Sequence, residues 1–203
     1  METGQRIQTE TRRDAEEVMR FKYYYIVQFL CAVLGQTVFA DTPLPPPETH
    51  TVASRNFDFG AERNPKTNET VVYRLERGSP DGRVRGETLW KFPKWFRDFR
   101  LSNDGRAIVA GPDYLNLLPP DIAKQNPVLL TFIFNGRVIR EVTLKQLLAS
   151  ETKLTPTASH LYWGRLYEEM DPNDRVMVDT VIGFFVFDAK TAKCVFSPSN
   201  AID

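Results

Sequence analysis

Residues 128–144, VLLTFIFNGRVIREVTL, place two apolar and β-branched runs on either side of an Asn-Gly pair. Val, Ile, Thr and Phe favour β-strands, and Asn-Gly tolerates the positive φ angles that a tight hairpin turn requires. The stretch therefore predicts an antiparallel hairpin. Asp-Gly pairs stand between similar runs in SPDGR (79–83) and SNDGR (102–106). Three hairpins of this kind predict an all-β fold built as an antiparallel meander.

Most of the chain after residue 50 shows the same alternation of short strands and turn residues, and helix signals are scarce. Two short helical turns are expected, in PPDIAKQN (119–126) and TLKQLLAS (143–150). The remaining strands are expected in TVVYRLE (70–76), ETLWKF (87–92), DFRLS (98–102), RAIVAG (106–111), HLYWGRLY (160–167), RVMVDT (175–180), GFFVFD (183–188) and KCVF (193–196).

Two of these segments carry a family resemblance. LSNDGRAIVAG (101–111) resembles the S-x-DGR-x-h-h-x-G signature of β-propeller repeats, where h is hydrophobic, and FDAKTAKCVF (187–196) resembles their closing hairpin. The resemblance implies propeller-like hairpin repeats between residues 51 and 197, about three units, whereas closed propellers have about four to eight blades. We therefore expect a partial propeller or a curved sheet, with a β-sandwich as the alternative.

Open repeats leave sheet edges exposed, and apolar edges promote association. We expect residues 51–60, TVASRNFDFG, to return and pair with the last repeat, because Phe57 and Phe59 alternate as in a half-buried strand. Pairing with a second chain is the alternative, and it would make the protein a homo-oligomer.

Residues 1–40 carry the features of a secretory signal peptide. Arg20 and Lys22 precede the uncharged run YYYIVQFLCAVLGQTVFA (23–40), which ends in a small-residue cleavage pattern, and Met19 is a candidate true start. The alternative is an uncleaved membrane anchor, because about 18 uncharged residues approach the length that spans a bilayer.

The Pro-rich residues 41–50, DTPLPPPETH, predict an extended linker that separates this segment from a β-rich domain at 51–203. The expected location is extracytoplasmic, either periplasmic or secreted, with a single-pass anchored protein as the alternative. Cys31 lies in the uncharged run, so its removal would leave Cys194 without an intramolecular disulfide partner. We expect Cys194 to be buried in the last strand.

The charge balance argues against a nucleic-acid partner, since the 203 residues contain 26 Lys and Arg against 26 Asp and Glu. Lys91, Lys94, Arg97 and Arg100 are spaced as on a helix, but Pro93 interrupts a helix there. The chain lacks a Gly-rich phosphate loop, a paired-Cys motif and a Gly-x-Ser-x-Gly elbow, so no cofactor is expected.

His160, beside Ser159, is the candidate for a catalytic group, although a triad also needs an orienting residue and an oxyanion hole. Asp171, Asn173 and Asp174 are the candidates for calcium ligands, but they lack the glycine and distal glutamate of an EF-hand loop. Asp-Pro-Asn-Asp is also a favourable type I turn sequence. We therefore expect neither a catalytic nor a metal site from these residues.

Trp95 and Trp163 are the candidate ligand-binding residues, because exposed aromatic rings can stack on a glycan or a peptide. Strand alternation places Trp90 and Phe92 together on one face, which is expected to be buried. Trp95 follows a proline and is expected nearer the surface.

These features predict an exported, non-enzymatic domain that acts by binding a protein or another ligand, in the cell envelope or outside the cell. One alternative is a hydrolase-like enzyme with a loop-borne site, using His160 and the acidic residues of 168–179. The other is a self-assembling structural subunit. The membrane is a partner only if residues 23–40 are retained.

Overall fold

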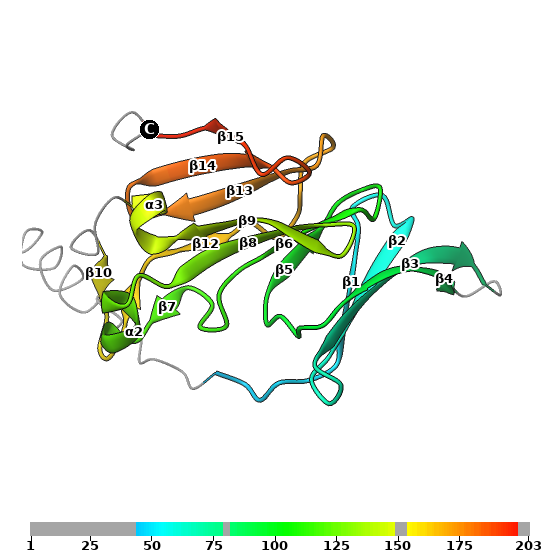
Figure 1. Cartoon of the computed structure of the whole chain (residues 1–203), viewed down its shortest axis with the longest axis horizontal. Coiled ribbons are helices and arrows are strands. Elements are labelled where there is room, and N and C mark those ends of the chain that lie inside the picture. Colours follow the sequence, from blue (N-terminus) through cyan, green and yellow to red (C-terminus); the bar gives the residue numbers. More distant parts are fainter. Residues whose placement is uncertain (1–43, 79–81, 149–153, 199–203) are drawn as a thin grey trace, which may run out of the picture. The chain divides into compact units, whose positions relative to one another are not determined.

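The computed structural model describes residues 44–78, 82–148 and 154–198, which belong to one compact unit, Asp41–Asp203. These residues form four antiparallel sheets and two short helices, with no closed barrel (Figure 1). The all-β prediction is confirmed. The expected signal peptide or anchor at 1–40 lies outside the described residues.

Three of the sheets have four strands, which lie in each sheet in the order of the chain. In one of them, the chain leaves the sheet between its second and third strands to form β7 (Leu117–Leu118) and α2 (Pro120–Lys124). We name them the N-terminal, middle and C-terminal sheets. The N-terminal sheet contains β1 (His50–Ala53), β2 (Phe59–Asn64), β3 (Glu69–Arg77) and β4 (Arg83–Phe92); the middle sheet contains β5 (Phe99–Leu101), β6 (Ala107–Ala110), β8 (Val128–Phe134) and β9 (Arg137–Thr143); the C-terminal sheet contains β12 (Gly164–Leu166), β13 (Arg175–Thr180), β14 (Gly183–Asp188) and β15 (Cys194–Phe196).

The fourth sheet is small and pairs a short hairpin with a strand that lies far earlier in the chain. It contains β7 (Leu117–Leu118), β10 (Thr155–Pro156) and β11 (Leu161–Tyr162), and the helices are α2 (Pro120–Lys124) and α3 (Leu144–Leu148). The single strand expected at 160–167 is therefore two strands, because β11 pairs with β7 whereas β12 pairs with β13. Trp163 lies between β11 and β12, where the chain passes from one sheet to the other. Gly164, the next residue, has a φ of 150°.

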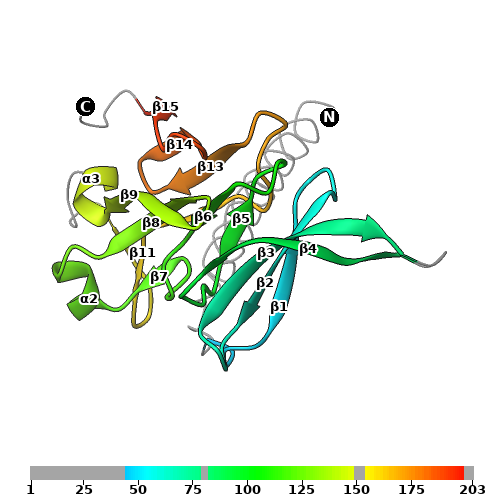
Figure 2. The same ribbon diagram turned by 45° about the vertical axis from the view of Figure 1, so that its right-hand side comes forward.

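The middle sheet contains a strand, β6, that is buried on both faces. Along β6, Ala107 and Val109 belong to the larger apolar cluster, which includes side chains of the C-terminal sheet. Ile108 and Ala110 belong to the smaller cluster, which includes side chains of the N-terminal sheet. Because side chains alternate across a strand, β6 joins the flanking sheets into one core (Figures 1 and 2).

The hairpin turns have the chemistry that the sequence predicts. Asn135 and Gly136, between β8 and β9, have φ angles of 48° and 75°, and Gly105, between β5 and β6, has a φ of 68°. These values lie in the left-handed region that Gly and Asn tolerate. The third predicted turn, SPDGR, joins β3 to β4 but lies partly outside the described residues.

The predicted return of residues 51–60 to the last repeat is wrong. β1 pairs with β2 within the N-terminal sheet, and β15 is an edge strand of the C-terminal sheet. Residues 54–58 turn the chain back instead, because Ser54 bonds Phe59 through its backbone and Asn56 through its side chain. Phe57 lies at the tip of this loop with 59% of its surface exposed, so it is not half-buried.

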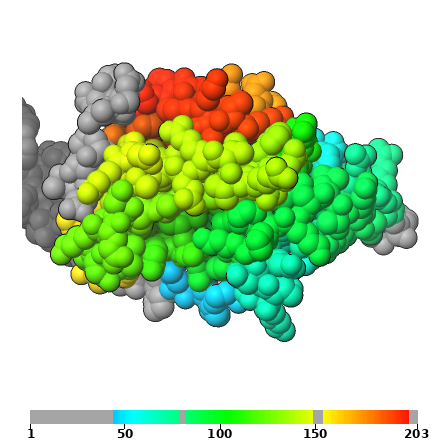
Figure 3. Space-filling view, viewed as in Figure 1, coloured from blue at the N-terminus to red at the C-terminus, as the bar shows by residue number. Residues whose placement is uncertain are grey.

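The edge strands carry exposed apolar side chains. Val195 and Phe196 of β15 are exposed, as are Val138 and Ile139 of β9. The surface of β9 and α3, yellow-green in Figure 3, faces the viewer below the C-terminal sheet. Cys194, expected to be buried, is exposed because β15 has a neighbour on one side only. Assembly into a homo-oligomer stays a prediction.

No helix within residues 44–78, 82–148 and 154–198 combines the length and the apolar character that a membrane crossing needs.

Replacing Gly105 with valine should destabilise the fold. A Cβ there would lie 2.5 Å from Phe59 Cδ1, and the positive φ disfavours any β-branched residue. We expect the free energy of unfolding in urea to fall by at least about 1 kcal/mol. Gly82→Val is the matched control, because a Cβ at Gly82 meets nothing within 4 Å. Equal stability of the two variants would contradict the assigned turn.

Candidate functional site

Loops from the three large sheets meet at Asn103, in the turn between β5 and β6. The Asn103 backbone N–H donates to Asp174 Oδ1 at 2.6 Å, and its side-chain amide donates to the Asp171 carbonyl at 3.2 Å. On its other side, the Asn56 amide donates to the Asn103 carbonyl at 2.8 Å, and Asn56 N–H donates to Asn103 Oδ1 at 3.2 Å. Asn103 thus links the β1–β2 loop to the loop before β13. We call this contact region the loop junction.

Lys190 adds a charged link to the loop junction. Its ammonium lies 2.8 Å from Asp104 Oδ2 and 2.8 Å from Asp174 Oδ2. The Asp174 side chain is only 7% exposed, so the ion pair with Lys190 and the hydrogen bond from Asn103 offset the cost of burying it. Lys190 lies in the turn between β14 and β15, which brings a further turn of the C-terminal sheet to the junction.

The ion pair between Lys190 and Asp104 shifts the pKa values of these two groups. Burial raises the pKa of Asp104, but hydrogen bonds from Lys190, Ser102 and the Arg106 N–H outweigh it, so the net pKa lies below the ordinary 3.8. Hydrogen bonds to Asp104 and Asp174 raise the pKa of Lys190 above 10.5, against the opposing effect of burial. Asp104 and Lys190 are therefore both charged at neutral pH.

The candidate calcium ligands hold the turn before β13. Asp171 Oδ1 accepts hydrogen bonds from the N–H groups of Asn173 and Arg175, both at 2.8 Å. Asp174 has a φ of 58° and turns its carboxylate to Asn103 and Lys190. Within the described part of the chain, no group of three or more His, Cys, Asp and Glu side chains is arranged to hold a metal ion. The observed bonds give these residues a structural role.

His160 lies in the turn before β11. Its Nδ1 is 2.9 Å from Ser159 Oγ, and its backbone N–H and carbonyl both bond Thr157. The acidic residues 168–174 lie in the different loop that joins β12 to β13. The expectation that His160 has no catalytic role stays a prediction.

The three tryptophans lie in different environments. Trp163 is 1% exposed and donates through its indole to the Leu115 carbonyl, so it is a core residue and cannot serve as an exposed stacking surface. Trp90 packs with Phe92 against the smaller apolar cluster, as alternation predicts. Trp95 is half-buried in the loop between β4 and β5. Of the two candidate ligand-binding residues, only Trp95 lies near the surface.

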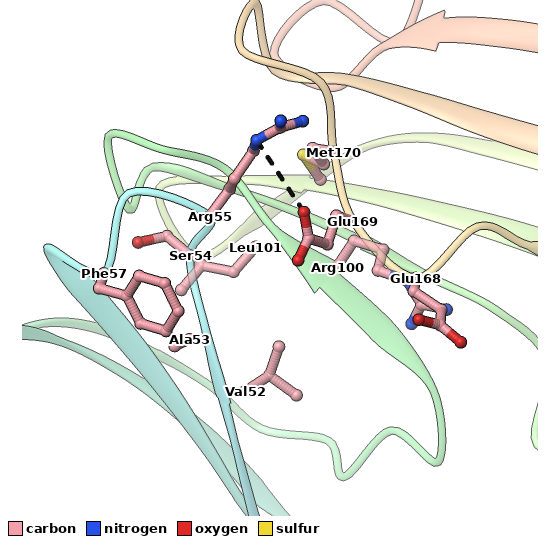
Figure 4. Close-up of a pocket in the computed structure, with 10 residues that line it drawn as sticks. All are labelled: Val52, Ala53, Ser54, Arg55, Phe57, Arg100, Leu101, Glu168, Glu169 and Met170. Atoms are coloured by element: carbon pink, nitrogen blue, oxygen red, sulfur yellow. Dashed lines mark ion pairs between the residues drawn. The ribbon is translucent and has the colours of Figure 1, made fainter.

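A pocket of about 210 Å³ opens beside the loop junction (Figure 4). The three large sheets each contribute to it, and its lining is partly apolar and partly charged. From the β1 end come Val52, Ala53, Ser54, Arg55 and Phe57; from β5 come Arg100 and Leu101; from the loop before β13 come Glu168, Glu169 and Met170.

The charged residues of the pocket differ in how many bonds hold their side chains. Arg100 is held firmly, because its guanidinium bonds Asp98 and the carbonyls of Leu166 and Tyr167. Arg55 and Glu169 are exposed and face each other across the rim at 3.9 Å, as Figure 4 shows. The rim pair is loose enough to exchange partners with a ligand.

Sequence reasoning missed both the loop junction and the pocket. Asn103 and Asp104 were visible as turn residues, and Lys190 lies within the turn of the propeller-like closing hairpin. Their contact with Asp174 spans 71 residues for Asn103, and no local pattern encodes such a pairing.

No protein-family model matches the chain, and no curated protein is significantly similar to it.

Lys190→Gln should destabilise the protein, because it leaves the buried Asp174 carboxylate without a cation. We expect a loss of about 1–3 kcal/mol in the free energy of unfolding. Lys193→Gln, an exposed lysine of the same turn, is the control. If both variants unfold at the same urea concentration, the ion pairs of Lys190 do not stabilise the junction.

The stability of the protein should depend on pH in two windows. Since the folded pKa of Asp104 is lowered, its contribution is complete above about pH 3.8 and is lost as the pH falls through the folded value. Since the folded pKa of Lys190 is raised, its contribution is complete below about pH 10.5 and is lost as the pH rises through the folded value. Urea unfolding of Lys190→Gln should show smaller losses in both windows than wild type, and identical pH profiles would contradict this assignment.

Proposed function

We propose that the chain is an exported, non-enzymatic β-domain that binds a segment of another protein at the pocket beside the loop junction. The observation that carries the proposal is the composition of the pocket, whose walls come from all three large sheets. Binding residues on loops that a rigid scaffold positions are a common arrangement in binding proteins. Export rests on the signal-peptide features of residues 19–40.

The size of the pocket favours one side chain of a polypeptide over a small-molecule ligand. Its volume of about 210 Å³ is below the range of about 300–1,000 Å³ that small-molecule sites occupy. Val52, Leu101 and Phe57 supply apolar walls, and Met170 is a side chain that adapts to different shapes.

Of the charges that line the pocket, Arg100 is bonded to Asp98 and Arg55 faces Glu169. Glu168 remains, and it favours a basic residue beside the inserted apolar one.

The tryptophans also favour a protein over a glycan. A glycan site normally stacks sugars on exposed rings, and the burial of Trp163 removes one of the two rings considered. His160 and Ser159 do not line the pocket, so the hydrolase alternative gains no support from it.

We also propose that the three large sheets are propeller-like units. The chain order of the strands in each sheet and the position of the DGR turn between β5 and β6 support this interpretation.

Selection of displayed random peptides on the immobilised protein tests the binding function. The enriched peptides should combine an apolar residue with Lys or Arg. Their affinity should fall at least about tenfold for Phe57→Ser, because burial of an aromatic ring contributes about 1.5–3 kcal/mol. Phe184→Ser is the control, since Phe184 is also exposed but does not line the pocket. Failure to enrich any peptide, or equal loss in both variants, would contradict binding at this pocket.

A further inference from the structure

Two arginine side chains lie close to the ring of Trp95. The guanidinium carbon of Arg97 is 5.2 Å from the centre of the Trp95 ring, and that of Arg63 is 5.5 Å from it. Cations at this distance over an indole ring are attracted by its negative face. Two further bonds fix the loop: Trp95 N–H donates to Asn68 Oδ1 at 3.0 Å, and Arg63 donates to the Phe96 carbonyl at 2.8 Å.

The proline-rich segment 44–48 lies against this arrangement. Arg97 Nη1 donates to the Pro45 carbonyl at 2.7 Å, and the Trp95 indole N–H points to the Glu48 carbonyl at 3.4 Å. Glu48 also contributes favourably to the charge of Arg63, whose pKa is lowered mainly by burial. Its composition predicts only a linker between two parts of the chain. The two contacts show that the segment also packs on the folded domain.

The proline-rich segment and the surface around Trp95 carry complementary hydrogen-bonding groups. A polyproline segment has no internal hydrogen bonds, so its carbonyl groups remain free to accept bonds from a binding surface. Proteins that recognise such segments use aromatic rings together with donors such as an indole N–H. Because proline restricts the unbound segment to extended conformations, binding costs little conformational entropy.

Arg63 and Arg97 each have a further N–H group that could donate a hydrogen bond. The Nε atoms of Arg63 and Arg97 are both buried and have no hydrogen-bond partner in the described part of the chain. Buried donors without partners are uncommon in folded proteins. Their position next to the Trp95 ring marks this surface as a site suited to further acceptor groups, such as carbonyls and carboxylates.

We propose that Trp95, Arg63 and Arg97 form a binding site for proline-rich segments, and that residues 44–48 of the same chain occupy it. This site differs from the pocket beside the loop junction, and the two share no residues. A peptide of the same chemistry competes for the site only when the chain's own segment is weakened, because a tethered segment has an effective concentration on the order of millimolar.

The test uses the protein as isolated from expressing cells, labelled with ¹⁵N at its three tryptophan indoles. In the triple variant Pro45→Gly, Pro46→Gly, Pro47→Gly, the Trp95 indole resonance should move. The Trp90 and Trp163 resonances should stay in place, because these indoles donate to the internal carbonyls of Gly105 and Leu115. Trp95→Phe assigns the resonance.

Addition of the peptide LPPPETH, the sequence of residues 44–50, should return the Trp95 resonance of the triple variant to its wild-type position at about 1 mM. The control peptide LGGGETH should have no effect, and neither peptide should move the resonance in wild type. An unchanged Trp95 resonance in the triple variant, or no response to LPPPETH, would overturn the proposal. If all three resonances move, the experiment is repeated with Arg97→Gln in place of the triple variant. An unchanged Trp95 resonance in Arg97→Gln would also overturn the proposal.

Discussion

Burial of β6, the second strand of the middle sheet, on both of its faces is the constraint on which the rest of the structure depends. The four residues of β6, Ala107–Ala110, are all fully buried, and they alternate between the two apolar clusters. A strand with two apolar faces is stable only when something covers each of them. The N-terminal sheet covers one face and the C-terminal sheet covers the other, so each flanking sheet contributes to the stability of the sheet between them.

The loop junction follows from this arrangement. The β5–β6 turn belongs to the middle sheet, and loops of both flanking sheets contact it through Asn103 and Asp174. Buried polar groups at such a place need partners, and the bonds around Asn103 together with Lys190 supply them. The pocket lies beside these bonds and takes residues from the same three sheets, so its geometry depends on the junction remaining closed.

The parts of the fold that local chemistry determines could be predicted from the sequence. Asn135, Gly136 and Gly105 occupy the positive φ angles that their residue types tolerate, and β8, β13 and β14 span the predicted residues. Pairings over long distances could not be predicted. Alternating phenylalanines at 57 and 59 looked like one strand, yet a Ser54-Asn56 turn separates them from β1. Trp95 and Trp163 look alike in sequence, and only tertiary packing decides which ring is buried.

The central claim is that the three large sheets form one cooperative unit around the middle sheet. Native-state amide hydrogen exchange tests it most directly, because it measures the free energy of opening for each strand. The account predicts that the slowest amides of β3, β6 and β13 exchange with one common free energy, equal to that of global unfolding. A distinctly lower value for β3 or β13, with β6 still protected, would show that a flanking sheet opens by itself and would contradict the account.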